Sequence, residues 1–333
     1  MDKITLSTIT PVYRGVDTLR KLVIALDQFR ISLIQSQSPL QLTESIFVDD
    51  GSADGSNNVL VELKNEYPWM KVITLSRNFG QHPATVAGIL HSSGDWIVTL
   101  DEDLQHDPKF ITELLREAVT NSHDVVYANS KDSIHQSFFR DMSSKGLKFV
   151  LAKITKNKNL PFFNSFRLIR GSIARVTSAV TIDQTYFDVA LTWFTIRVGV
   201  VYVQLKDLRY IETNKSGYSF RSLITHARKL IQSSNVKIVR IGLFVGFTVM
   251  ILGLVATFFI LFEKIYCPEM INSVGWTSLI ITVLLLGGLN IFLVGLALEN
   301  LSMLMMQSHG KPKFFEIDRT SDNVLREWYF KNY

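Results

Sequence analysis

The sequence predicts an open α/β sheet that is followed by two membrane-spanning helices. Apolar, β-rich runs alternate with segments of helical period over about the first 130 residues, and the links between them are short. Two long runs without any charged residue lie near the C-terminus, where the apolar excess of this 47% hydrophobic chain is concentrated. These observations indicate a globular α/β part and a membrane part within 333 residues.

Five strands and four helices are expected in the α/β part. The strands are short runs rich in β-branched and aromatic residues, and the helices show apolar side chains every three or four positions. The strands are predicted at residues 4–12, 45–48, 72–75, 96–100 and 124–127, and the helices at 19–29, 54–63, 83–90 and 108–119. The buried stripe of the first helix is predicted to be Leu19, Leu22, Val23, Leu26 and Phe29.

Polar residues follow each of the first four predicted strands. In open α/β sheets, ligands bind outside the carboxyl ends of the strands, so these polar clusters are expected to converge on one crevice. The clusters are Tyr13 with Arg14, Asp49 with Asp50, Arg77 with Asn78, and Asp101 with Asp103. This convergence, more than any single motif, predicts a site.

The three acidic residues Asp101, Glu102 and Asp103 follow the fourth strand directly. Their mutual repulsion favours a bound cation, and carboxylate oxygens suit Mg²⁺ or Mn²⁺. The alternative is a solvated acidic turn that caps the next helix, a role expected of Asp107. The chain has neither a GxGxxG nor a Walker sequence, so a bound nucleotide would have its diphosphate held through metal at Asp101 and Asp103. Asp49 and Asp50 would then accept hydrogen bonds from a pyrimidine N–H or from ribose hydroxyls.

Two basic amphipathic segments suggest contact with an anionic membrane surface. They span residues 137–158 and 218–237, and ordinary surface helices are the alternative for them. Between them, Arg167 and Arg170 are three positions apart, which would let them share a helix or turn face and form a fork for phosphate. The net charge of +5 also suits an anionic partner.

Two uncharged runs, 241–262 and 276–298, are each long enough to span a bilayer, since a helix of 22 residues is ~33 Å long. A pair of buried core helices is the alternative. Basic residues precede the first run and follow the second, so both ends are expected in the cytoplasm and the loop containing Cys267 outside. The N-terminus enters a strand directly, which predicts no signal peptide, and a single cysteine excludes an intrachain disulfide.

Four motifs in this order resemble those of GT-A glycosyltransferases of family 2. More narrowly, they resemble the polyprenyl-phosphate glycosyltransferases, which include dolichyl-phosphate mannose synthases, bactoprenol glucosyltransferases and undecaprenyl-phosphate aminoarabinose transferases. The motifs are Pro11-Val12-Tyr13, Phe47-Val48-Asp49-Asp50-Gly51-Ser52, Leu75-Ser76-Arg77-Asn78-Phe79-Gly80-Gln81-His82 and Asp101-Glu102-Asp103-Leu104-Gln105-His106. A weaker match continues through Phe166-Arg167-Leu168 and Ser216-Gly217-Tyr218-Ser219-Phe220, so the resemblance covers about nine tenths of the chain.

The resemblance implies roles for individual residues. Asp101 and Asp103, with Gln105, would bind the metal and diphosphate of a nucleotide sugar. Pro11, Tyr13, Asp49 and Asp50 would hold the nucleoside, with Arg77 on the same donor side. Arg167 and Arg170 would face the lipid phosphate, and Arg209 would help at the diphosphate.

The chain departs from the family pattern at three places near the expected sugar or acceptor. Arg14-Gly15 stands where the family usually has an Asn-Glu type pair. Asn164-Ser165 stands where a Gly-Asp type pair is common. Lys215-Ser216-Gly217-Tyr218 lacks the usual Lys between Ser and Tyr.

The expected organisation follows from these features. A GT-A catalytic domain would span residues 1–217, with a candidate interfacial helix at 137–158. A juxtamembrane amphipathic helix would follow at 218–240, a transmembrane hairpin at 241–298, and a cytoplasmic tail of no assigned role at 299–333.

The leading hypothesis is sugar transfer from a nucleotide diphosphate, by default a UDP-sugar, to undecaprenyl or another polyprenyl phosphate at the inner membrane, for surface polysaccharide or lipopolysaccharide modification. A second hypothesis is transfer to a hydroxyl of a lipid-linked saccharide, which needs a general base. Asp188 is the candidate by its resemblance to an acid on a helix of hydroxyl-directed relatives, and an ordinary helix-start residue is the favoured alternative for it. A third is a non-catalytic membrane scaffold that has kept the fold. Related enzymes suggest a homo-tetramer, and no nucleic-acid partner is expected; the sugar and the base stay open.

Overall fold

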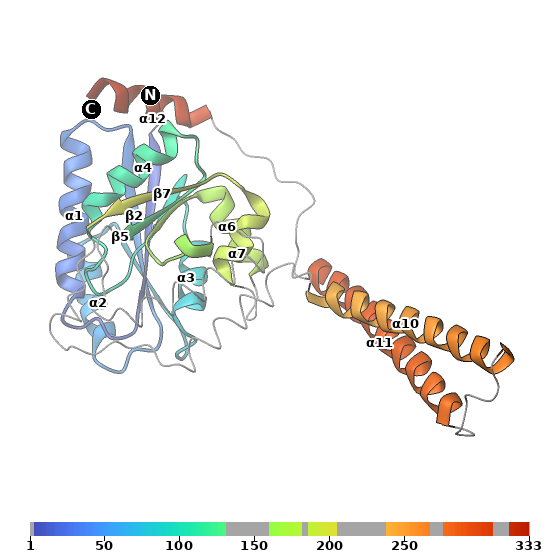
Figure 1. The fold of residues 1–333 in the computed structure, drawn as a ribbon. Coiled ribbons are helices and arrows are strands. Elements are labelled where there is room, and N and C mark those ends of the chain that lie inside the picture. Colours follow the sequence, from blue (N-terminus) through green and yellow to red (C-terminus); the bar gives the residue numbers. More distant parts are fainter. Residues whose placement is uncertain are drawn as a thin grey trace. The chain divides into compact units, whose positions relative to one another are not determined.

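The computed structural model divides into two compact units, which are described separately (Figure 1). One unit comprises residues 1–234 and 312–333, and the other comprises residues 235–311. The structure describes residues 3–130, 160–181, 186–204, 238–266, 276–308 and 320–332. The candidate interfacial helix at 137–158, the basic segment at 218–237, Arg209 and Cys267 lie outside the described residues.

The first unit is built on a seven-stranded sheet of order β3-β2-β1-β4-β6-β5-β7. Strands β1 to β4 run parallel, whereas β6 is antiparallel to both of its neighbours and β5 pairs in parallel with β7. The mixed sheet therefore has a wholly parallel half, where the expected site lies, and a half that contains one reversed strand. The strands are β1 (Ile4–Val12), β2 (Leu40–Asp49), β3 (Met70–Thr74), β4 (Trp96–Thr99), β5 (Val125–Ser130), β6 (Arg167–Arg170) and β7 (Val198–Val203).

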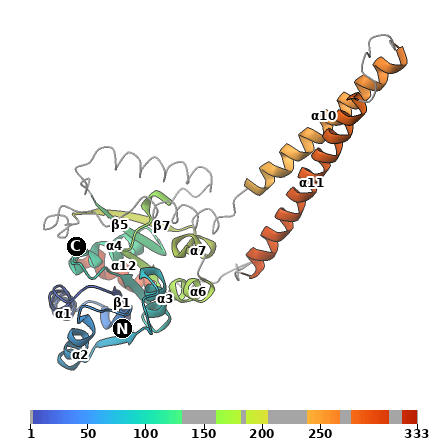
Figure 2. The same ribbon diagram turned by 90° about the horizontal axis from the view of Figure 1, so that it is seen from below.

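Helices cover both faces of this sheet, as Figures 1 and 2 show. One buried cluster joins α1, α2, α4 and α12 to one face, and a second cluster joins α3, α6 and α7 to the other. The helices are α1 (Leu19–Gln35), α2 (Ser56–Glu66), α3 (Gln81–Leu90), α4 (Ile111–Thr120), α6 (Gly171–Val180), α7 (Phe187–Phe194) and α12 (Thr320–Asn332), with 3₁₀ turns η1 (Pro108–Phe110) and η2 (Leu160–Phe162).

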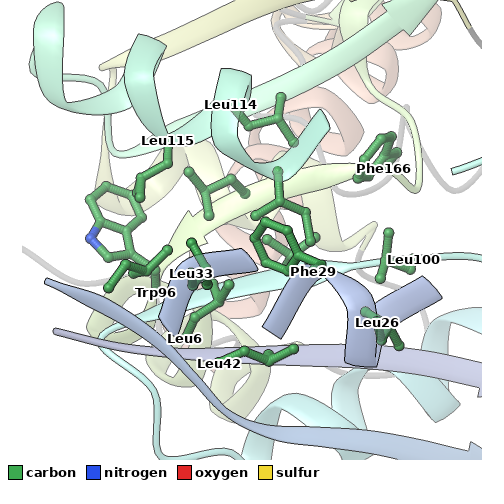
Figure 3. Close-up of a cluster of buried hydrophobic side chains, with 14 of the residues drawn as sticks. Leu6, Leu26, Phe29, Leu33, Leu42, Trp96, Leu100, Leu114, Leu115 and Phe166 are labelled. Carbon is green, nitrogen blue, oxygen red and sulfur yellow. The ribbon is translucent and has the colours of Figure 1, made fainter. Parts of the chain in front are cut away.

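The first cluster shows how the sequence pattern becomes a core (Figure 3). Leu26 and Phe29 of α1 belong to the same buried cluster as Leu6 and Leu42 of the sheet, and Trp96 of that cluster is fully buried. The predicted stripe of α1 is confirmed, since all five of its side chains are buried. Burial of each such side chain stabilises the fold by about 1.5–3 kcal/mol before the loss of conformational entropy is counted.

The helix α12 belongs to the first unit, although it follows both apolar helices in the chain. Its Leu325 and Tyr329 are buried in the first cluster. The Arg326 guanidinium donates to the carbonyl of Val119 at 3.0 Å, which satisfies an otherwise open acceptor at the end of α4. The segment to which the sequence analysis gave no role therefore completes the core.

The second unit is a helical hairpin of α10 (Ile238–Tyr266) and α11 (Trp276–Ser308). Both helices contain an apolar stretch long enough to cross a membrane, Gly246–Glu263 and Leu279–Leu298, and only 11% of each stretch is buried. A Cβ on Gly246 would lie 2.6 Å from the backbone nitrogen of Phe292, and one on Gly288 would lie 2.9 Å from the Cα of Met250. The two glycines therefore allow close helix packing of the kind found in membranes.

Candidate active site

The carboxyl ends of strands β1 to β4 are connected by hydrogen bonds at one edge of the sheet. The Glu102 carboxylate, beyond β4, accepts from the backbone N–H groups of Tyr13 at 3.0 Å and Arg14 at 3.1 Å, beyond β1. The Asp50 carboxylate, beyond β2, accepts from the backbone N–H groups of Phe79 at 2.7 Å and Gly80 at 2.8 Å. These contacts confirm that the strand ends lie together, and that they form one ligand-binding crevice stays a prediction.

Asp101 is held from several directions at the centre of this edge. Its Oδ1 accepts from Gln81 Nε2 at 2.6 Å, and its Oδ2 accepts from Ser165 Oγ at 2.6 Å. Its backbone N–H donates to His106 Nδ1 at 2.9 Å, and the His106 ring stacks on Phe166. Its side chain is 25% exposed, so the carboxylate is oriented by the protein and still reachable from solvent.

Asp103 and Gln105 lie in the turn that follows. Asp103 Oδ1 accepts from the backbone N–H of Gln105 at 3.2 Å, and Leu104 between them has a positive φ of 63°. Asp107 caps η1, because its carboxylate accepts from the backbone N–H of Lys109 at 3.0 Å. The predicted role of Asp107 as a helix cap is therefore confirmed.

Asp49 and Asp50 are both buried, at 2% exposure, and hold loops of the protein. Asp49 accepts from Ser52 and from Asn57 Nδ2, whereas Asp50 holds the start of α3 through the N–H groups described above. Gly51 between this pair and Ser52 has a φ of 69°, and a Cβ there would lie 2.7 Å from the backbone nitrogen of Asn78. Contact with a nucleoside stays a prediction for these two carboxylates.

Tyr13 and Arg77 present exposed side chains at the same edge. Tyr13 is 39% exposed, and the Arg14 guanidinium lies 5.4 Å from its ring centroid. The Arg77 guanidinium lies 4.3 Å from the ring centroid of Phe79. Pro11 is buried within β1, paired with Val48, so it shapes the strand from which Tyr13 emerges.

Arg167 and Asp188 form a buried ion pair. Arg167 is 3% and Asp188 1% exposed, and Asp188 Oδ1 accepts from both Arg167 Nη1 and Tyr127 Oη. Burial, reinforced by the Asp188 carboxylate, raises the pKa of Tyr127 well above its usual value. Burial alone would lower the pKa of Arg167, but the Asp188 carboxylate, together with Tyr127 and Tyr186, outweighs burial and raises the pKa. Asp188 is thus enclosed and neutralised.

Arg170 is the centre of a second buried charge cluster, on the same strand. It is 5% exposed, donates to Asp124 Oδ1 at 3.2 Å, and donates to Asp322 Oδ2 of α12 at 2.7 Å. Its guanidinium lies 4.6 Å from the ring centroid of Trp96. The prediction that Arg167 and Arg170 share a face and form one fork is wrong, because residues three apart on a strand point to opposite faces.

The acidic residues at the end of β4 fit a divalent cation. No group of three or more His, Cys, Asp or Glu gathers as a metal site within the described residues. Mg²⁺ is commonly held by one or two carboxylates together with substrate phosphates and water. Asp101 and Asp103, both half-buried at the strand end, supply that donor set.

Comparison with known proteins identifies the family. The family model described as "Glycosyl transferase family 2" matches residues 7–177, more than half of the chain and all four motifs. This chain belongs to glycosyl transferase family 2. As a family 2 glycosyltransferase it is an enzyme that transfers sugar, and its catalytic unit has the GT-A type of α/β sheet.

Two relatives align with this glycosyltransferase over almost its whole length. An uncharacterized glycosyltransferase of Synechocystis is 25% identical over 316 residues, which cover 95% of each chain. The undecaprenyl-phosphate 4-deoxy-4-formamido-L-arabinose transferase of Photorhabdus laumondii is 26% identical over 329 residues, which cover 96% of each. Among solved structures, mannosyl-3-phosphoglycerate synthase from Rubrobacter xylanophilus matches 69% of this chain and 72% of its own, with a TM-score of 0.48 and 12% identity.

The structure gives contacts to residues for which the sequence analysis predicted no such role. Gln81 and Ser165 hold Asp101, Glu102 holds the backbone after β1, and, in the buried cluster on β6, Asp322 pairs with Arg170. Gln81 and Glu102 lie inside motifs that carry the resemblance, so their positions offered a signal. Asp322 offered none, because 152 positions separate it from Arg170.

Proposed function

We propose that this glycosyltransferase moves a sugar from a nucleotide diphosphate donor, by default a UDP-sugar, to a polyprenyl phosphate in the inner membrane, for modification of a surface polysaccharide or lipopolysaccharide. The observation that carries the proposal is the enclosure of Asp188. A hydroxyl acceptor needs a general base within hydrogen-bond reach, and the proposed base is 1% exposed and paired with Arg167. A phosphate acceptor needs no base, because it is already an anion at neutral pH.

The reaction is written as one displacement. An oxygen of the acceptor phosphate attacks the anomeric carbon, the bond from that carbon to the donor diphosphate breaks, and the nucleoside diphosphate leaves with the electron pair. The configuration at the anomeric carbon is inverted, and no proton has to move. The name of the Photorhabdus relative, an undecaprenyl-phosphate transferase, supports this acceptor class.

The residues at the strand ends would serve the donor. Asp101 and Asp103, with Gln105, would hold Mg²⁺ or Mn²⁺, and the bound ion would stabilise the charge that develops on the leaving diphosphate. Tyr13 would offer an exposed ring to the nucleoside, and Arg77, whose guanidinium lies over Phe79, would offer a cation on the donor side. Arg167 and Arg170 are already neutralised by buried carboxylates, so we assign the acceptor phosphate to other cations of the chain.

The test is turnover with defined acceptors. Purified protein in detergent is incubated with Mn²⁺ or Mg²⁺, a panel of nucleotide sugars, and either undecaprenyl phosphate or a lipid-linked saccharide. We expect release of the nucleoside diphosphate with one donor, only when undecaprenyl phosphate is present, and no release by Asp101→Asn. Release that depends on the lipid-linked saccharide instead would establish the hydroxyl acceptor, and absence of release with every pair would contradict the proposed donor and acceptor classes.

We propose that α10 and α11 cross the membrane as a hairpin whose two ends are cytoplasmic. The support comes from α12, which follows α11 and yet packs in the same unit as the residues that precede α10. An even number of crossings is needed to return the chain to that unit. The apolar stretches Gly246–Glu263 and Leu279–Leu298 are long enough for such crossings.

Cys267, the single cysteine, lies in the predicted outer loop and tests this topology. A membrane-impermeant maleimide added to intact spheroplasts is expected to label it. The matched control is Cys267→Ser with Phe330→Cys, since Phe330 is 74% exposed on α12 and should be labelled only after lysis. The reverse pattern would contradict the proposed orientation.

A further inference from the structure

Each of the two carboxylate oxygens of Asp101 accepts a hydrogen bond from a side chain, and the two donors come from different parts of the fold. Gln81, the first residue of α3, donates to Oδ1, and Ser165, just before β6, donates to Oδ2. A carboxylate has about four lone-pair positions, so two such bonds leave capacity for a cation. These two hydrogen bonds fix the plane of the Asp101 carboxylate, and the Asp101 side chain is still partly exposed to solvent.

Gln81 and Ser165 are themselves held in place by groups deeper in the protein. Gln81 follows Gly80, whose N–H is bound by the buried Asp50. The Ser165 carbonyl accepts from Thr99 Oγ1 at 2.5 Å, which ties it to the end of β4. The residues that provide these hydrogen bonds, Asp50 and Thr99, are each 2% exposed and therefore belong to the core.

The turn that presents Ser165 is also held from its other side. The preceding carbonyl, that of Asn164, accepts from Arg167 Nη1 at 3.1 Å. The same nitrogen of Arg167 donates to Asp188, which in turn accepts from Tyr127 Oη at 2.7 Å. The Asn164 amide adds hydrogen bonds to the carbonyls of Ala128 and Phe162, each at 3.0 Å. The buried ion pair thus connects to the Asp101 carboxylate through two adjacent residues of one turn.

We propose that Gln81 and Ser165 are positioning residues that orient Asp101 for the divalent cation and donor diphosphate, and that the buried Arg167–Asp188 pair keeps Ser165 in place. This inference rests on the proposed function, because it takes Asp101 to be a cation ligand. The proposal explains why Ser165 stands at a position where the resembled family commonly has an acid. The serine hydroxyl is a neutral donor, so it orients Asp101 without adding charge repulsion. The proposal also gives Arg167 and Asp188 a role that needs no contact with the acceptor.

The test measures cation binding directly. Free Mn²⁺ is followed by electron paramagnetic resonance during titration of the full-length protein in detergent, with UDP present, for the wild type and for Ser165→Ala, Gln81→Ala and Ser165→Thr. Loss of an outer-shell partner of a metal ligand typically weakens binding 10–100-fold. We expect a Mn²⁺ dissociation constant about 10-fold higher for the two alanine variants, an unchanged melting temperature, and a near-normal value for Ser165→Thr, which keeps the hydroxyl.

A matched control removes a hydroxyl that has only a local partner. Ser32→Ala on α1 loses one bond to the carbonyl of Phe29 and is expected to bind Mn²⁺ as the wild type does. Wild-type affinity in Ser165→Ala and Gln81→Ala would overturn the positioning role and leave the proposed function standing. Absence of Mn²⁺ binding in the wild type itself would overturn the cation site of the proposed function, and the positioning role with it.

Discussion

Two regions of the catalytic unit use charge in opposite ways. At the carboxyl ends of β1 to β4, Asp101 and Asp103 are half-buried and their carboxylates remain accessible. Around the reversed strand β6, Arg167 and Arg170 are almost fully buried and each is paired with carboxylates. The first arrangement leaves charge available to a ligand, whereas the second neutralises charge inside the protein.

The comparison shows why residue type alone does not identify a site. An arginine at the sheet edge and an arginine within β6 look equally suited to phosphate in the sequence. Burying a charge without a partner costs several kcal/mol, so each buried arginine must be matched by an acid, and that match removes it from ligand binding. Substitutions around β6 should therefore lower stability, whereas substitutions at the carboxyl ends of β1 to β4 should lower turnover.

The largest effect is expected from Arg170→Ala. The variant leaves Asp124 and Asp322 buried without their cation, a change that typically costs about 3–5 kcal/mol of unfolding free energy. We expect the melting temperature in detergent to fall by on the order of 10 °C.

Arg20→Ala is the matched control, because its pair with Glu66 is about half exposed on both sides. Exposed pairs contribute about 0–1 kcal/mol, so little change is expected. Equal melting temperatures for the two variants would contradict the structural role given to Arg170.

The second effect is expected on turnover and not on stability. Asp103→Asn removes a charge that the proposed cation site uses, and losses of one such electrostatic contact are about 10²–10³-fold in kcat. Nucleoside diphosphate release measures the loss, and the melting temperature should stay within about 2 °C of the wild type, since substitutions at partly exposed positions outside the core change stability little.

Asp107→Asn is the control within the same loop. Asp107 caps η1, and asparagine caps a helix about as well as aspartate. Turnover close to that of the wild type is expected. A comparable loss in both variants would indicate that the loop, and not the Asp103 carboxylate, is what the reaction needs.

The sequence predicted the parallel half of the sheet well because local patterns decide it. The stripe of α1 has a helical period, and polar residues after apolar strands mark the edge where Asp101 and Asp103 lie. The reversed half was less predictable. Arg167 and Arg170 lie on a strand of only four residues, too short for its period to show, and their partners Asp188 and Asp322 are distant in sequence. Long-range pairing of charges cannot be read from local periodicity.

The third effect tests whether α12 is part of the catalytic core. Leu325 is fully buried, so Leu325→Ala should destabilise the unit by about 3 kcal/mol through lost burial and the cavity left behind. Phe330→Ala on the same helix is the control, because Phe330 is 74% exposed and surface substitutions usually change stability by less than about 0.5 kcal/mol. Thermal unfolding measures both, and a stable Leu325→Ala variant would show that α12 is dispensable for the core.

The smallest effect concerns Glu44, a buried carboxylate away from both charge regions. Burial alone would raise its pKa, but hydrogen bonds from Lys71, Ser7 and Ser93 outweigh burial and hold the pKa below its ordinary value of 4.5. A carboxyl group whose pKa is lowered by folding stabilises the protein above its unfolded pKa, and that stability is lost as the pH falls through the folded pKa.

Glu44→Gln should therefore be less stable than the wild type at pH 7, by on the order of 1 kcal/mol. The gap should narrow once the pH falls below 4.5, because the wild-type carboxylate is then being protonated. Melting temperatures between pH 7 and pH 3 measure this, with Glu62→Gln as a control whose side chain is 67% exposed. A gap that stays constant with pH would mean that shape, and not the charge of Glu44, stabilises the fold at that position.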